Sequence, residues 1–102
     1  MNVIMLEIDF DKAYAQVGKM EQCADGMLEQ HNKLVSLIAE VRGAWQGESA
    51  NAYIKKMEAL AEKIKSDAEK CRANAKSFRL KIGTIKKAEE SIVDAMGKMA
   101  GN

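Results

Sequence analysis

The helical pattern of this chain is interrupted at Arg42-Gly43-Ala44-Trp45-Gln46-Gly47-Glu48-Ser49. This stretch lies near the middle of 102 residues that contain no proline, and it brings two of the seven glycines close together. Glycine permits the positive φ that ends a helix, and Gly47 or Ser49 can cap the helix that follows. We therefore predict a turn over residues 43–48 between two helices.

Before this turn, apolar residues recur at alternating steps of four and three, and His31 is the only polar member of the series. The series is Leu6, Phe10, Ala13, Val17, Met20, Ala24, Met27, His31, Leu34, Ile38, Val41 and Trp45. Such a period of about 3.5 residues is that of a coiled-coil seam. Asp9 suits the N-cap, and Asp11 suits the first turn. We expect a helix over about residues 9–43.

After the turn a second series follows, in which only Glu89 is charged. It is Ala50, Tyr53, Met57, Leu60, Ile64, Ala68, Cys71, Ala75, Phe78, Ile82, Ile85, Glu89, Ile92, Met96 and Met99. Leu60, Ile64 and Ala68 are separated by two consecutive steps of four, which predicts a locally relaxed supercoil. We expect a helix over about residues 48–98, with its kink or break at Gly83-Thr84 and a tail over residues 97–102.

A short connection between two long helices predicts an antiparallel hairpin, so the chain is expected to be all-α and a single domain over residues 1–102. With the turn centred near residue 46, the numbers of facing residues sum to about 92. Residues after about 88 should then overhang the start of the first helix.

Apolar side chains also flank both series, which makes each stripe wider than one hairpin can cover. They are Tyr14, Leu28, Val35 and Leu37 in the first helix and Ile54, Leu80 and Val93 in the second. Stripes of this width are typical of four-helix bundles. Because a core this small is rarely stable alone, we predict a dimer of hairpins.

Composition excludes several classes of function. Sixteen basic and 15 acidic residues give a net charge of +1, which argues against a nucleic-acid partner. With 47% hydrophobic residues the chain is not an acidic disordered tail, and it has no run of about 20 apolar residues for stable membrane insertion. One histidine and two cysteines leave little material for a metal or catalytic site, so we expect no enzyme and no cofactor. The N-terminal residues lack the basic region of a secretory signal peptide, whether translation starts at Met1 or Met5.

Three side chains on or beside the seams have alternative interpretations. His31 should face Leu60 and Ile64, as a core or edge histidine with a satisfied hydrogen bond or as a pH switch. Cys23 should face the stretch that contains Cys71, and the pair is either two free thiols or an intrachain disulfide.

The turn sequence Trp45-Gln46-Gly47, between two long helices and followed by Ala50 and Tyr53, resembles the WXG family. These are small helical-hairpin proteins related to the early secreted antigenic target, and they are substrates of type VII secretion systems of Gram-positive bacteria and mycobacteria. The resemblance covers the whole chain in length and architecture. It implies export to the outside of the cell without a cleaved signal peptide, after folding in the cytoplasm, and the type VII secretion ATPase as a partner.

A second pattern near the C-terminus is similar to that of Firmicutes members: Ile85, Glu89, Ile92 and Met96 have the spacing of their hydrophobic and acidic positions. The Tyr-x-x-x-Asp/Glu export motif of actinobacterial members is absent, because Gly18 and Met57 stand where an acid would follow Tyr14 and Tyr53. The resemblance therefore implies a homodimer of the Firmicutes type.

Three functions follow as hypotheses. The first is a secreted effector, adaptor or secretion component that acts by protein–protein interaction. The second is a targeting or chaperone partner that forms a heterodimer with a larger toxin carrying a similar hairpin. The third is a cytosolic structural or membrane-surface helical hairpin unrelated to secretion. In the first, Trp45 either plugs the end of the bundle or is read during export. The segment from Ile85 onward is then a second recognition element, or else a tail that packs on the partner hairpin or frays at Gly97 and Gly101.

Overall fold

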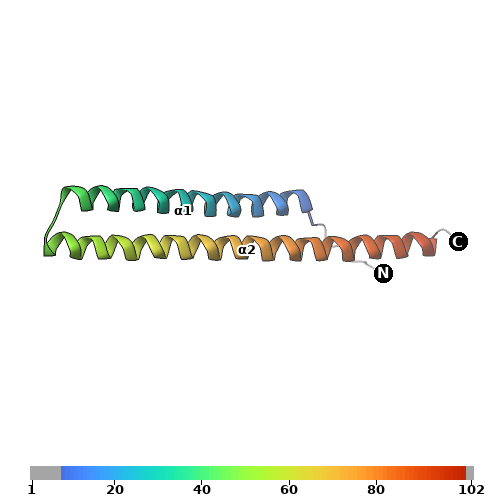
Figure 1. The fold of residues 1–102 in the computed structure, drawn as a ribbon. Helices are drawn as coiled ribbons and strands as arrows, with labels where there is room; N and C mark the ends of the chain where they lie inside the picture. The colour runs from blue at the N-terminus through green and yellow to red at the C-terminus, as the bar shows by residue number, and fades with distance from the viewer. Residues whose placement is uncertain (1–7, 101–102) are drawn as a thin grey trace.

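The structure is a computed structural model that describes residues 8–100 of the chain. Two helices make up this part: α1, Phe10–Ala44, and α2, Glu48–Ala100. They run antiparallel and side by side over the whole length of α1, and α2 continues beyond the start of α1 (Figure 1). The predicted helical hairpin is confirmed. Leu6, the first residue of the predicted series, lies outside the described residues.

The N-terminus of α1 has the cap that the sequence predicts. The side chain of Asp9 accepts a hydrogen bond of 3.0 Å from the backbone N–H of Lys12, and Asp11 lies in the first turn. Both acids interact favourably with the positive end of the helix dipole. Capping therefore fixes where α1 begins.

A single glycine, and not two, makes the turn. Gly43 lies inside α1, which ends at Ala44, so the expectation that Gly43 helps to end the helix is wrong. Gly47 has a φ of +116°, a conformation that side chains with a Cβ disfavour. Its carbonyl accepts a hydrogen bond of 3.0 Å from the N–H of Asn51, which places Gly47 at the N-terminus of α2.

The second helix is continuous over 53 residues. The kink or break expected at Gly83-Thr84 is therefore wrong, and the hydroxyl of Thr84 donates to the carbonyl of Leu80 at 3.0 Å within the helix. The helix also includes residues 97–100, which were expected to belong to a tail. No proline interrupts α2, and one glycine costs only about 1 kcal/mol in a helix that is packed elsewhere.

The contact between the helices differs from the predicted series at two positions in α2. Ile54 and Ala61 are 5% and 3% exposed, whereas Tyr53 and Leu60 are 60% and 52% exposed and lie outside the contact with α1. With Ile54 and Ala61 in the series, steps of four and three alternate without interruption from Ala50 to Met99. The relaxed supercoil predicted at residues 60–68 is therefore wrong. At both positions the predicted series contained the larger of two adjacent apolar residues.

The contact face of α1 follows the predicted series throughout the described residues. Its members are buried or half-buried: Phe10, Ala13, Val17, Met20, Ala24, Met27, His31, Leu34, Ile38 and Val41. In α2 the matching face contains Met57, Ile64, Cys71, Ala75 and Ile82, while Phe78 is half exposed.

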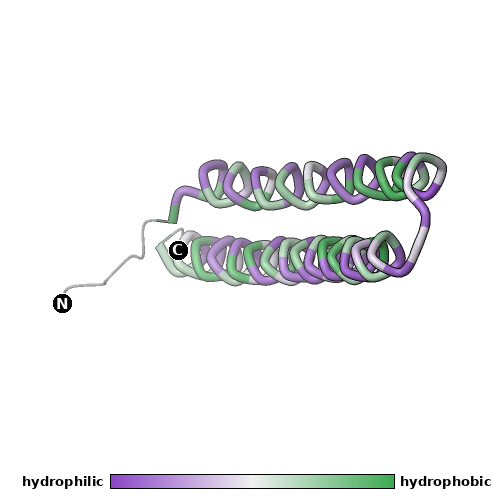
Figure 2. The backbone as a smooth tube through the Cα atoms, turned by 90° about the vertical axis from the view of Figure 1, so that its left-hand side faces the viewer, coloured by the Kyte–Doolittle hydropathy of each residue, from purple (hydrophilic) through white to green (hydrophobic). Residues whose placement is uncertain are grey.

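The hairpin buries little for its size. Eight side chains of the described chain are buried, and five of them are alanines: Val17, Ala24, Ile38, Ala50, Ile54, Ala61, Ala68 and Ala75. The radius of gyration is 23.6 Å, where a compact chain of this length would have about 13 Å. The accessible surface is 8222 Å², against about 5,700 Å² for a compact protein of this mass. Hydrophobic and hydrophilic residues alternate along both helices, so apolar positions recur over their full lengths (Figure 2).

Three interhelix ion pairs lie along one flank of the hairpin, and they use all three arginines of the chain. They are Arg42–Glu58, Arg72–Asp25 and Arg79–Glu21. We call these six residues the ion-paired flank. Exposed pairs of this kind contribute little stability each, and all three join α1 to α2.

Candidate functional site

The aromatic pair at the turn is the most prominent feature of that end of the molecule. The ring centroids of Trp45 and Tyr53 lie 5.6 Å apart, with 44° between the ring planes. Trp45 is the C-cap residue of α1, with extended backbone at φ −135° and ψ 123°, and its N–H donates to the carbonyl of Val41 at 2.8 Å. Because this backbone leaves the helical path, Trp45 is 43% exposed and does not plug the space between α1 and α2.

The main apolar cluster of the hairpin lies behind this turn. Ile38, Ile54 and Ala61 form its buried centre, with Leu34, Val41 and Met57 packed against it. The first residue of this cluster in α2 is one position after Tyr53. The Trp45–Tyr53 pair therefore lies next to this cluster in sequence, with both rings partly open to solvent.

The second candidate element is the C-terminal overhang, which we define as residues 90–100. It extends about 16 Å beyond Glu89, at the helical rise of about 1.5 Å per residue. Phe10, the first residue of α1, lines a surface pocket together with Lys86, Glu89, Glu90, Val93 and Asp94. The first helix thus begins beside Glu89, close to the position that the facing residues predicted.

The four predicted export-signal residues differ in their surroundings. Ile85 is 47% exposed, Ile92 58% and Met96 46%, while Glu89 is half-buried beside Phe10. Val93 and Met99, at 50% and 81%, add to the apolar surface of this end. These side chains share one end of α2, and its last turns have no part of α1 beside them (Figure 1).

The turn and the overhang lie at opposite ends of a molecule 83 Å long (Figure 1). One chain therefore cannot bring Trp45 and Glu89 into a single site. A site that contains both elements requires two chains.

His31 lies in the interface between the helices, as the sequence predicts. Its Nδ1 is 2.8 Å from the carbonyl oxygen of Ala61, and the ring is half-buried. Because a carbonyl oxygen can only accept a hydrogen bond, Nδ1 carries the hydrogen and donates this hydrogen bond. The hydrogen-bonded histidine is the interpretation that the structure supports.

Both cysteines are free thiols in this structure. Cys71 is half-buried, and its thiol donates to the carbonyl of Met20 at 3.4 Å, while Cys23 is exposed. Cys71 thus faces the turn of α1 that precedes Cys23.

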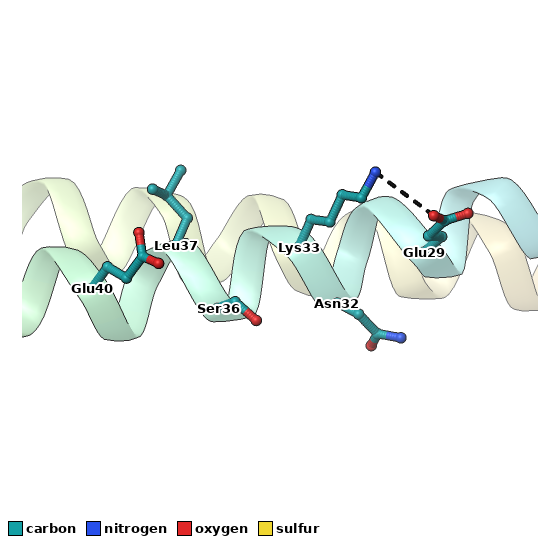
Figure 3. A pocket seen from close by; sticks show the side chains of 6 residues that line it. All are labelled: Glu29, Asn32, Lys33, Ser36, Leu37 and Glu40. Atoms are coloured by element: carbon teal, nitrogen blue, oxygen red, sulfur yellow. Dashed lines mark ion pairs between the residues drawn. The ribbon is translucent and has the colours of Figure 1, made fainter.

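A shallow pocket on the outer face of α1 has no features of a binding site (Figure 3). Its six lining residues all come from one helix, and its only ion pair is Glu29–Lys33, at 3.6 Å between neighbouring turns. No group of three metal-ligand side chains occurs within residues 8–100. Neither helix has, in its described part, a segment long and apolar enough to cross a membrane.

Models of known families, curated proteins and solved structures yield no match to the chain.

Sequence reasoning missed two parts of these sites. Ile54 and Ala61 would have been found by taking a step of four from Ala50 and keeping steps of four and three strictly alternating. The pairing of Trp45 with Tyr53 had no sequence signal, since it depends on the extended backbone of Trp45.

Proposed function

We propose that this protein is a small substrate of a type VII secretion system, similar to the WXG family, that is exported as a folded helical dimer. The observation that carries the proposal is the position of Trp45 and Gly47. Both lie at the tip of a two-helix hairpin, Gly47 with a φ of +116° and Trp45 with its ring 43% exposed. A large exposed aromatic ring held by a neighbouring ring is a suitable contact for a receptor.

The dimer is supported by how little one hairpin buries. Thirteen large hydrophobic side chains of the described chain are exposed, and no large side chain is fully buried. The excess of accessible surface over a compact protein is roughly 2,500 Å², and standard protein interfaces bury about 1,600 Å² in total. A partner of similar shape is therefore needed to cover both helices.

In an antiparallel dimer, the turn of one chain lies beside the overhang of the other. Trp45 of one copy and Glu89 to Met96 of its partner would then form a composite signal at each end. Such a signal exists only in the folded dimer, which gives the secretion ATPase a way to reject unpaired chains. The protein acts by protein–protein interaction, as effector, adaptor or secretion component, without catalysis of its own.

A heterodimer with a larger toxin that carries a similar hairpin is the second candidate. The observation that favours it is the same uncovered apolar surface, which a related hairpin would fit. Light scattering on the purified chain separates the two, because a homodimer forms from this chain alone and the alternative leaves it monomeric.

The test of the function is binding to the cytoplasmic part of a type VII secretion ATPase, measured by calorimetry. The folded protein should bind, and Trp45→Ala should weaken binding about tenfold or more while the far-UV circular dichroism stays unchanged. If Trp45→Ala binds as tightly as the unchanged protein, the turn is not part of the export signal.

A further inference from the structure

One flank of α2 carries the ion pairs, and the other is apolar. Glu58, Arg72 and Arg79 belong to the ion-paired flank, and each directly follows a residue of the contact series: Met57, Cys71 and Phe78. Since consecutive residues are about 100° apart on a helix, these predecessors point toward the opposite flank.

These predecessors belong to a series that recurs every seven positions, and the second half of this series is less covered than the first. Ala50 is buried, and Met57, Ile64 and Cys71 are half-buried. Phe78, Ile85 and Ile92 are 50%, 47% and 58% exposed, and Met99 is 81% exposed. None of the eight residues is polar or charged, apart from the thiol of Cys71. The last four residues of this series are thus only partly covered within the hairpin.

A second seven-residue series runs beside the first, on the same side of α2. It consists of Tyr53, Leu60, Asp67, Asn74, Lys81, Ala88 and Ala95. We call the two series together the open flank. Its only charged residues are Asp67 and Lys81, and neither forms an ion pair within the described part of the chain.

These charges are placed symmetrically about Asn74, with one heptad between Asn74 and each of them. An antiparallel copy of α2 centred near Asn74 therefore brings Asp67 opposite Lys81 of the other copy, twice. It also brings Cys71 opposite Phe78, Ile64 opposite Ile85 and Met57 opposite Ile92. A two-fold interface requires such a self-complementary pattern, because every contact occurs in both directions.

We propose that a second copy of this chain packs antiparallel on the open flank, with the two-fold axis at Asn74. This inference rests on the self-association proposed above and specifies its face and register. Asn74 lies against Asn74 of the other copy, where an amide can donate and accept at once. A polar residue of this kind at an otherwise apolar seam specifies register in coiled coils.

The ion-paired flank is less suitable than the open flank as the dimer interface. Its charges already pair within the chain, and covering them would remove their hydration without a new partner. On the open flank, Asp67 and Lys81 gain a partner on association. Lys81 lies with Nζ 6.0 Å from the ring centroid of Phe78, so its charge is held at the apolar surface that becomes covered.

Cysteine crosslinking tests the face. In the full chain with Cys23→Ser and Cys71→Ser, Asn74→Cys should form a covalent dimer on mild oxidation with diamide. Ala73→Cys is the matched control, because it lies at the same level of α2 but on its outer side, and it should stay largely uncrosslinked. Crosslinking through Ala73→Cys instead would place the dimer on another face and overturn the inference, while the proposed dimer itself would stand.

Charge exchange tests the register without a thiol. Asp67→Lys and Lys81→Asp should each weaken dimerisation roughly tenfold, because each sets like charges against each other at two symmetric places. The double variant should restore dimerisation to within about threefold of the original. Additive weakening in the double variant would overturn the register. A chain that is monomeric before any substitution would contradict the proposed dimer and the inference together.

Discussion

Trp45 and Tyr53 contact each other across the turn, with ring centroids 5.6 Å apart, and both remain partly open to solvent. One ring belongs to the cap of α1 and the other to the second turn of α2. Their contact joins the two helix ends at the tip of the hairpin.

Trp45→Ala should reduce the free energy of unfolding by only about 1–2 kcal/mol, well below the 3–5 kcal/mol typical of a buried tryptophan. The reason is that 43% of Trp45 is exposed and its main described aromatic contact is Tyr53. Urea unfolding measures the change. Export should fall strongly in the same variant, so a loss of export explained by unfolding alone would contradict the recognition role.

Gly47→Ala should destabilise the hairpin by about 1–2 kcal/mol, because alanine disfavours the φ of +116° that the turn requires. Gly43→Ala is the matched control. Gly43 is helical with open space where a Cβ would lie, so alanine should stabilise by about 0.5–1 kcal/mol. Thermal unfolding of both variants gives the sign of each change in stability. Equal changes in the two variants would contradict the assignment of Gly47 as the turn residue.

Ile54→Ala should cost about 2–4 kcal/mol, because Ile54 is 5% exposed and belongs to the main apolar cluster. Leu60→Ala should cost the isolated hairpin less than about 1 kcal/mol, since Leu60 is 52% exposed, and should mainly weaken dimerisation. Denaturant unfolding at several protein concentrations separates the two effects. A larger loss for Leu60→Ala at high dilution would favour the contact face first expected from the sequence.

Glu89→Ala should lower export without changing helicity, while Glu69→Ala, at an acid of α2 outside the turn and the overhang, should leave export unchanged. Glu89 is half-buried beside Phe10, whereas Glu69 is exposed. Comparison of the variant proteins in culture medium and in cells measures the effect. Equal export of Glu89→Ala and the unchanged protein would leave the turn as the recognition element.

The helices and the turn could be predicted from the sequence because a period of 3.5 residues and a capped N-terminus are local signals. The contact face of α1 could be predicted for the same reason. The face of α2 was less determined locally, since Tyr53-Ile54 and Leu60-Ala61 are adjacent apolar pairs, and only the alternation of steps over the whole helix separates them. The structure places the smaller or β-branched residue against α1, where the helices approach closely.

The continuity of α2 and the position of Trp45 off the contact face could not be predicted, for a different reason. A lone glycine weakens a helix only slightly, so Gly83 does not outweigh the packing of Tyr14, whose hydroxyl lies 3.7 Å from where a Cβ of Gly83 would be. Trp45 continues the seam in sequence, but its extended backbone takes the ring out of the helical register. Neither outcome depends on a local residue pattern.

Secretion of the unmodified protein is the most direct test of the proposed function. The chain is expressed in a Gram-positive host with a type VII secretion system, beside the same host without the secretion ATPase, and a cytosolic protein serves as the lysis control. The protein should accumulate in the medium only when the ATPase is present. Retention in the cells of both strains, or equal amounts in both media, would contradict the proposed function.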